Sequence, residues 1–204
     1  MSGIVVALLL LAGPGDRTGD LLLPVGAPDR LSERSIELTE IGGFGAPRKP
    51  RPAVPAHFHT GIDIRRPHAN YDSEPVYPVA RGVVISRRTD GPYAQLIVEH
   101  EITGERFWSV YEHVAGITVG DSSDVDPMVP IARFMNRDEL RAYGWQFNHV
   151  HFEILKVKPF ALAPDQKHPG RKFSSYTLLC RTPADLERYF YNPLRFLAER
   201  WSHR

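Results

Sequence analysis

The stretch Asn148-His-Val-His-Phe-Glu-Ile154 decides how the middle of the chain folds. Successive side chains of a strand point to opposite faces, so a strand here turns its three apolar residues one way and His149, His151 and Glu153 the other. The Cα atoms of the two histidines are then roughly 6.5–7 Å apart, close enough for both rings to serve one small centre. Two solvated histidines on a surface strand give the same pattern, so the interpretation depends on partners elsewhere in the chain.

Strand patterns dominate the chain from Val76 onward. Residues 97–113 (IVEHEITGERFWSVYEH) predict a β-hairpin that turns at Thr103 and Gly104, with β-branched and aromatic residues on both arms. A pleated sheet of such strands needs one apolar face, and the alternation in this region supplies it. The sequence therefore predicts a mainly β fold, a compact antiparallel β-sheet domain.

Helices are few, and cap residues mark where they begin. Asn136 caps the first, which Gly144 ends. Thr182 and Asn192 each precede a proline, a residue favoured at the first position of a helix. Short helices are thus expected in one loop and near the C-terminus.

The composition excludes several classes of protein. The chain has 204 residues, enough for one domain with a hydrophobic core, and 25 Lys and Arg against 24 Asp and Glu give a net charge of +1. No basic run is interleaved with aromatic residues, so a nucleic-acid partner is not expected. The single cysteine, Cys180, excludes an internal disulfide and a cysteine-based zinc site.

An apolar run, GIVVALLLLAG, occupies residues 3–13 and has the length of a secretory signal peptide. It is too short to span a bilayer comfortably and lacks the usual preceding positive charges, and a buried strand or helix is the alternative. We expect residues 1–15 to be a signal peptide. The mature protein is then exported to the periplasm, the cell envelope or the medium, without a transmembrane span. The sequence leaves the oligomeric state open.

Side chains suited to metal binding lie in residues 57–63 (HFHTGID). His59 and Asp63 are four residues apart, on the same side of an extended backbone, and Gly61 between them has no side chain to block a shared ion. A further candidate is His113, and the alternation of a strand places it on the same face as Tyr111.

The chemistry of zinc connects these groups. Catalytic zinc takes three protein ligands, usually His and carboxylate, and leaves a fourth position for water. His59, Asp63 and one histidine of the 149–151 pair make such a set. The other histidine of that pair and His113 then flank the open position, where they can transfer protons or stabilise an oxyanion.

Four motifs stand in chain order: HTGID at 59–63, PVYPVARGVV at 75–84, YEH at 111–113 and HVHFE at 149–153. In this order they resemble the lysostaphin-like zinc endopeptidases, which cleave the peptides of peptidoglycan. The resemblance covers roughly residues 55–156 and the last strand-to-helix segment.

The resemblance implies a division of roles among five residues. His59, Asp63 and His151 are implied as the ligands of one Zn²⁺ ion. His113 and His149 are implied as the catalytic pair that does not bind the metal. The implied fold is a compact, mostly antiparallel β domain with an open groove over the metal.

Composition and the resemblance together divide the chain. Residues 16–54, rich in Gly, Pro, Arg and Asp, are expected from their composition to form an extended arm or linker. The resemblance adds that such an arm could cover the groove and inhibit. Residues 55–204 form the metallopeptidase domain. Two stretches, 134–148 and 157–190, are expected as insertions that depart from the family pattern.

The implied function is that of a zinc metallo-endopeptidase, a peptidoglycan hydrolase that cleaves peptide bonds in stem peptides or cross-links. A catalytically silent relative that binds cell wall or activates another hydrolase is the alternative. A zinc protein of another family with chance matches is a third interpretation. The presence of all five site residues favours the enzyme. A D-alanyl–diaminopimelate cross-link is preferred over a glycine bridge, with Arg65 and Arg66 as candidates to meet its free carboxylate.

Three other side chains have simpler expected roles. Tyr111 either hydrogen-bonds near the oxyanion or packs in the core. Glu153 braces the strand beside the metal. His100 is expected to be a structural histidine within its strand.

Overall fold

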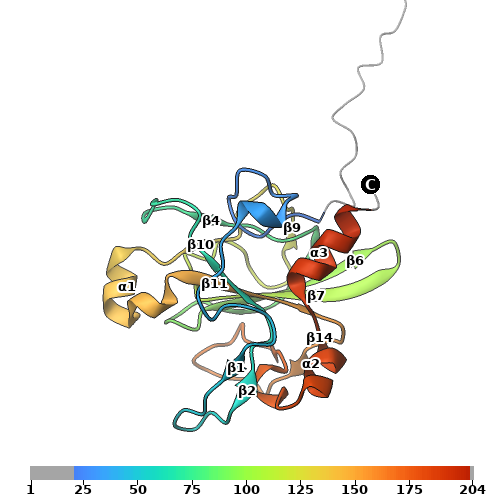
Figure 1. Ribbon diagram of the computed structural model, residues 1–204. Helices are drawn as coiled ribbons and strands as arrows, with labels where there is room; N and C mark the ends of the chain where they lie inside the picture. Colours follow the sequence, from blue (N-terminus) through green and yellow to red (C-terminus); the bar gives the residue numbers. More distant parts are fainter. Residues whose placement is uncertain (1–20, 203–204) are drawn as a thin grey trace, which may run out of the picture.

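A seven-stranded antiparallel sheet forms the centre of the computed structural model, which describes residues 21–202 (Figure 1). The order across the sheet is β14-β11-β7-β6-β5-β9, and β3 pairs with the same edge of β11 as β14. The prediction of a mainly β, antiparallel fold is therefore confirmed. The strands of this sheet are β3 (Ile62–Arg65), β5 (Gly82–Arg88), β6 (Gln95–Ile102), β7 (Glu105–Glu112), β9 (Asp124–Val125), β11 (His149–Leu155) and β14 (Phe190–Tyr191).

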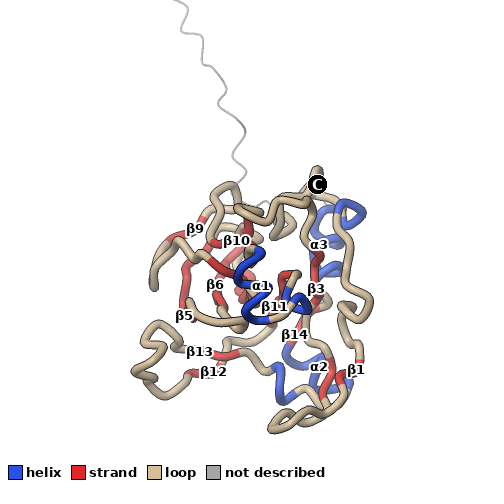
Figure 2. The backbone as a smooth tube through the Cα atoms, turned by 90° about the vertical axis from the view of Figure 1, so that its left-hand side faces the viewer, coloured by secondary structure: helices blue, strands red, loops and turns tan. Residues whose placement is uncertain are grey.

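Smaller sheets and short helices surround this sheet, and β1, β2 and α2 lie together at one end of the molecule (Figure 1). Figure 2 gives the same arrangement from the side. The small sheets are β4 (Pro75–Val76) with β10 (Ala132–Phe134) and β8 (Val114–Ala115), β1 (Pro47–Arg48) with β2 (His57–Phe58), and β12 (Phe160–Ala161) with β13 (Phe173–Ser174). The helices are α1 (Arg137–Tyr143), α2 (Pro183–Tyr189) and α3 (Pro193–Trp201), with 3₁₀ turns η1 (Glu33–Ser35), η2 (Trp145–Phe147) and η3 (Thr177–Leu179).

The hairpin of β6 and β7 turns where the sequence predicts. Its two turn residues both have positive φ, 50° at Thr103 and 82° at Gly104, and Ile102 pairs with Glu105 across the turn. Two-residue turns of this kind match the right-handed twist of the strands they join. This turn sets the register of the whole β6–β7 ladder. Strand β7 in turn pairs with β11 on its other edge.

The predicted helix boundaries are confirmed as well. Asn136 and Glu139 form a reciprocal capping box at the start of α1, and Thr182 and Asp185 form another at the start of α2. The side chain of Asn192 accepts a hydrogen bond from the first turn of α3. Each cap satisfies backbone N–H groups that a helix start leaves without a partner.

Strand β11 is buried on both faces. Its apolar face carries Val150, Phe152 and Ile154 into the main hydrophobic core. Its other face, with His151 and Glu153, is buried too, because the region 157–190 covers it with a second apolar cluster. The interpretation of this strand as a surface strand with solvated histidines is therefore excluded.

Two parts of the described segment 21–54 pack on the sheet. Residues 21–25 join the main core, and residues 37–42 run along the free edge of β3. There the N–H of Thr39 donates to the carbonyl of Asp63 (3.0 Å), and the N–H of Asp63 donates to the carbonyl of Gly42 (2.9 Å). The domain boundary at residues 54 and 55 stays a prediction.

The expected signal peptide lies outside the described residues. Among the helices within residues 21–202, none combines the length and apolar character needed to cross a membrane.

His100 is a buried structural histidine of β6. Its Nδ1–H donates to the carbonyl of Arg81 (2.7 Å), its Nε2 lies 2.7 Å from Ser109 Oγ, and its ring stacks on Phe107. Burial lowers the pKa of His100 to about 4, although the hydrogen bond to Arg81 opposes this. At pH values between about 4 and 6.5, the imidazole of His100 is therefore neutral in the folded protein, whereas it is protonated in the unfolded chain.

Lowering the pH from 6.5 to 4 is expected to destabilise the fold through His100. The unfolded state gains a proton near pH 6.5 and the folded state only near pH 4, so stability present above pH 6.5 is lost as the pH falls through this window. The shift corresponds to on the order of 3 kcal/mol at 1.36 kcal/mol per unit. The free energy of unfolding, measured by urea titration in the presence of a chelator, should fall less between pH 7.5 and pH 4.5 for His100→Gln than for wild type. An equal fall in the two proteins would show that the lowered pKa of His100 does not cause the loss of stability.

Candidate metal centre

The segment from His59 to Asp63 is positioned by its close approach to β11. A Cβ at Gly61 would meet the carbonyl of Phe152, so only glycine lets the two backbones come this near. Strand β3 pairs with β11 in a register that places Asp63 directly opposite His151. Opposed residues of an antiparallel pair point to the same face, so their side chains meet above the sheet.

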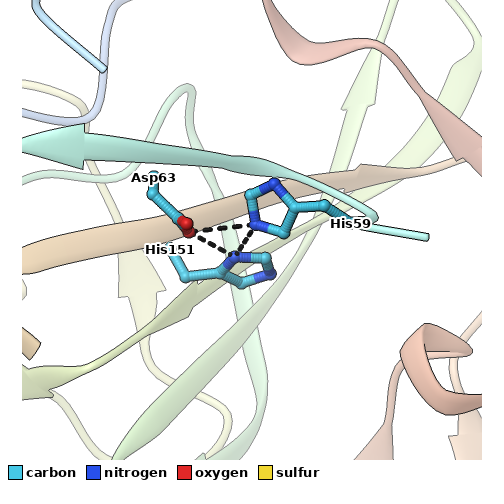
Figure 3. A group of neighbouring side chains, drawn as sticks. All are labelled: His59, Asp63 and His151. Atoms are coloured by element: carbon cyan, nitrogen blue, oxygen red, sulfur yellow. Dashed lines mark hydrogen bonds and ion pairs between the residues drawn. The ribbon is translucent and has the colours of Figure 1, made fainter. Parts of the chain in front are cut away.

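Three donor atoms converge at this point (Figure 3). His59 Nε2 lies 3.0 Å from Asp63 Oδ1 and 2.9 Å from His151 Nδ1, and Asp63 Oδ1 lies 3.0 Å from His151 Nδ1. All three residues are buried. Donors about 2.0–2.1 Å from a tetrahedral zinc ion lie roughly 3.3 Å from one another, so this spacing suits one ion.

The charges around the three donors also suit a cation. Burial alone lowers the pKa of His151, but hydrogen bonds between its ring and the carboxylates of Asp63 and Glu153 outweigh this and raise the pKa to about 10. Burial raises the pKa of Asp63, yet hydrogen bonds from His151 and His59 hold it far below its usual range. The site thus favours a positive charge among its side chains, and Zn²⁺ supplies that charge and binds the donor types present.

Glu153 holds the outer nitrogen of the His151 ring. Its Oε1 lies 3.0 Å from His151 Nε2 and accepts hydrogen bonds from the hydroxyls of Thr60 (2.5 Å) and Thr177 (2.6 Å). A carboxylate on the outer nitrogen fixes the orientation of a ligating ring and makes it a stronger donor. Thr177 comes from the region 157–190, so this region completes the surroundings of Glu153 and His151 as well as covering β11.

Two further histidines lie beside the three donors. The ring of His149 is 4.9 Å from that of His113, centroid to centroid, and its Nε2 is 3.5 Å from Asp63 Oδ1. Burial lowers the pKa of His113 and of His149 to about 4. Both rings are therefore neutral at neutral pH and can accept a proton. The five side chains named from the sequence are brought together in one place.

The sequence profile of Peptidase family M23 matches residues 57–164, more than half of the chain, and this span contains all five side chains. The chain belongs to peptidase family M23. The resemblance to lysostaphin-like peptidases is thereby confirmed, and Zn²⁺ is the cofactor of the His-Asp-His site. No sequence among the curated proteins matches the chain significantly.

Three solved structures are similar to this M23 chain. A zinc-containing peptidase from Vibrio cholerae is 25% identical, with 67% of this chain and 37% of that chain covered and a TM-score of 0.44. A putative peptidase M23 from Pseudomonas aeruginosa is 21% identical, with 57% and 44% covered and a TM-score of 0.32. The M23 metalloprotease pseudoalterin, from the deep sea, is 14% identical, with 86% and 92% covered and a TM-score of 0.39. The chain spans little more than a third of the length of the Vibrio cholerae peptidase.

The backbone at His113 in the M23 domain corrects one expectation. Tyr111 and His113 do not share a face: Tyr111 is fully buried in the core, where its hydroxyl accepts a hydrogen bond from the N–H of Val79 (2.8 Å). His113 follows the end of β7 with φ at +63°, a conformation unusual for a residue with a side chain. This turn of the backbone directs the ring toward His149. Strain of this kind is concentrated at functional sites, and it is invisible to a rule of alternation.

An aromatic wall stands beside His113. It consists of Tyr93 and Phe147, whose rings are 5.7 Å apart and lie 5.8 Å and 4.9 Å from the His113 ring. Phe147 belongs to the stretch 134–148, which the sequence predicts to be an insertion. Tyr93 remains 44% exposed, so this wall offers an apolar surface next to His113.

Arg66 is not free to bind a substrate carboxylate. Its guanidinium donates to Asn148 Oδ1 and to the carbonyls of Asn70 and Met135. Arg65 remains a candidate: it is exposed, lies on the same face of β3 as Asp63, and is opposite His149 in the β3–β11 register, although its Nε donates to the carbonyl of Leu38 (3.0 Å). Arg48, which contacts Asp63, does not stand out in the sequence, and Gly43, which contacts His59, is marked only by its place in a glycine-rich stretch.

Proposed function

We propose that this M23 chain is a zinc metallo-endopeptidase that hydrolyses peptide bonds in the stem peptides or cross-links of peptidoglycan. The observation that carries the proposal is the convergence of five side chains: His59, Asp63 and His151 with donor atoms about 3 Å apart, and the rings of His113 and His149 beside them. The catalytically silent alternative is disfavoured because such relatives are expected to lose ligands.

His59, Asp63 and His151 would hold the metal. When bound, zinc acts as a Lewis acid toward the peptide carbonyl and lowers the pKa of water toward ~7. His113 and His149 supply the proton transfers. The Nδ1–H of His113 donates to the carbonyl of Pro92 (2.6 Å), which orients the ring and leaves Nε2 as the nitrogen that can accept or return a proton. The pair can take the proton of the attacking water, donate to the developing oxyanion, and protonate the leaving amine.

The peptidoglycan substrate is supported by the order of the four sequence motifs and by the expected export signal. Within the wall, we propose cleavage of a D-alanyl–diaminopimelate cross-link. The aromatic wall of Tyr93 and Phe147 lies beside His113, and the register that sets Arg65 opposite His149 supports Arg65 as the group that would meet the free carboxylate of diaminopimelate. Paired carboxylates across a cleft, which a glycosidase needs, are not among the five site residues, so glycan strands should stay intact.

Digestion of isolated wall with zinc-loaded protein is expected to release uncross-linked stem peptides, detected by mass analysis of muropeptides. Parallel digestions with pentaglycine-bridged wall and with His113→Ala serve as controls, and both should give no products. Pentaglycine cleavage with intact stems would overturn the choice of bond. No cleavage of either wall by a protein that binds zinc would favour the cell-wall-binding alternative.

A further inference from the structure

A short segment that precedes the family match touches two of the three zinc ligands. This segment, residues 42–48 (GGFGAPR), is called the ligand arm below. Strand β1 at its end pairs with β2, which places Arg48 opposite His57, two residues before the ligand His59. The ligand arm therefore reaches the metal centre from outside the region that the family profile matches, 57–164.

The ligand arm sets the tautomer of His59. The Nδ1–H of His59 donates to the carbonyl of Gly43 (2.9 Å), so the lone pair of the imidazole is on Nε2, the atom that faces Asp63 and His151. The backbone of His59 is held by the same segment: its N–H donates to the carbonyl of Ala46 (2.8 Å). A ligating histidine needs such a partner on its outer nitrogen to keep the ring oriented.

The ligand arm also gives the two carboxylate oxygens of Asp63 different partners. Arg48 Nη2 donates to Asp63 Oδ2 (2.8 Å), which leaves Oδ1 directed at the two histidines. Arg48 is itself anchored, because its Nη1 donates to the carbonyl of Ile41 (2.9 Å). Its side chain is only 18% exposed, so the pair is shielded from much of the solvent.

The glycines of the ligand arm show how close it lies to the ligand. A Cβ at Gly42 would stand 2.8 Å from the Cβ of Asp63 and 2.9 Å from its carbonyl oxygen. A Cβ at the neighbouring Gly43 would meet nothing within 4 Å. Of these two adjacent glycines, only Gly42 is thus required by the packing against Asp63.

We propose that the ligand arm forms the part of the outer coordination sphere of the zinc ion that supports His59 and Asp63, with Arg48 as a positioning residue that holds Asp63 with Oδ1 turned to the two histidines. This inference rests on the zinc site proposed above. It gives the N-terminal arm a supporting role at the metal, in place of an inhibitory cover over the groove. The cationic charge of Arg48 opposes metal binding, but loss of the side chain leaves Asp63 Oδ2 without its partner and frees the carboxylate to turn away.

The test is the zinc dissociation constant, measured by competition with a chromophoric chelator at fixed pH. Arg48→Gln is expected to bind zinc about 10–100-fold more weakly than wild type, the usual cost of losing such a partner. Arg48→Lys, which returns one donor to Asp63, should recover part of the affinity. Arg51→Gln changes an exposed arginine of the same N-terminal region and should match wild type.

A second pair of variants keeps the inference testable if Arg48→Gln does not fold. Gly42→Ala should weaken zinc binding and alter the visible absorption of the Co²⁺-substituted protein, whereas Gly43→Ala should change neither. Zinc affinity in Arg48→Gln within two-fold of wild type, or higher, would overturn the role of Arg48 while leaving the proposed function intact. A wild-type protein that binds no zinc would overturn both.

Discussion

Replacing His151 with alanine is expected to strip the protein of zinc, whereas the same change at His149 should leave the ion bound. His151 Nδ1 lies within 3.0 Å of both other donor atoms, so its removal leaves two ligands for the metal. His149 Nε2 lies 3.5 Å from the carboxylate of Asp63, farther than the three donor atoms lie from one another, and its ring packs against His113. Metal content after gel filtration, measured by mass spectrometry, distinguishes the two variants. Equal loss of zinc in both would show that the division of roles within the HVH sequence is wrong.

The His151 variant needs a control for folding. Removing the imidazole also leaves the buried carboxylate of Glu153 without its histidine partner, which destabilises a fold by about 1–3 kcal/mol. His151→Gln keeps a hydrogen-bonding amide in this place, although it lacks the imidazole donor. A well-folded His151→Gln protein without zinc therefore separates loss of the ligand from loss of structure.

His113→Ala and His149→Ala are each expected to lose most peptidase activity while they retain the fold and the metal. General acid–base groups typically contribute about 10²–10⁴-fold to the rate, and both rings are neutral and close to the donors. The loss should appear in kcat/KM on cross-linked muropeptides at unchanged zinc content. His68→Gln is the matched control, because the side chain of His68 is 56% exposed and an amide can keep its hydrogen bond to the buried carboxylate of Glu74. A mere two-fold loss in both catalytic variants would remove these residues from the mechanism.

Much of the fold could be predicted from sequence patterns that span only a few residues. The alternation in residues 149–154, the positive-φ turn of the β6–β7 hairpin and the caps at Asn136 and Thr182 are all decided by neighbours a few residues apart. Such patterns act the same way whatever the rest of the chain does. They also set the strand on which the two central histidines lie.

The parts of the site that the sequence does not reveal depend on distant contacts. Arg48 has the appearance of any arginine in a polar arm until the chain folds and brings it to Asp63. Thr177 reaches Glu153 only because the region 157–190 packs on β11. The cluster of glycines at 42–45 was the one available signal, since closely packed backbones need residues without side chains.

The long sequence separations within the metal centre have a consequence for the order of folding. His59 and His151 are 92 residues apart, and Thr60 and Thr177 are 117 apart, whereas the β6–β7 hairpin closes through two turn residues. Contacts that close long loops form slowly, and a hairpin can form in microseconds. The donors meet only after β3 has docked on β11. Zinc uptake should therefore be a late step that reports a nearly completed fold, and it should not act as a nucleus around which the chain collapses.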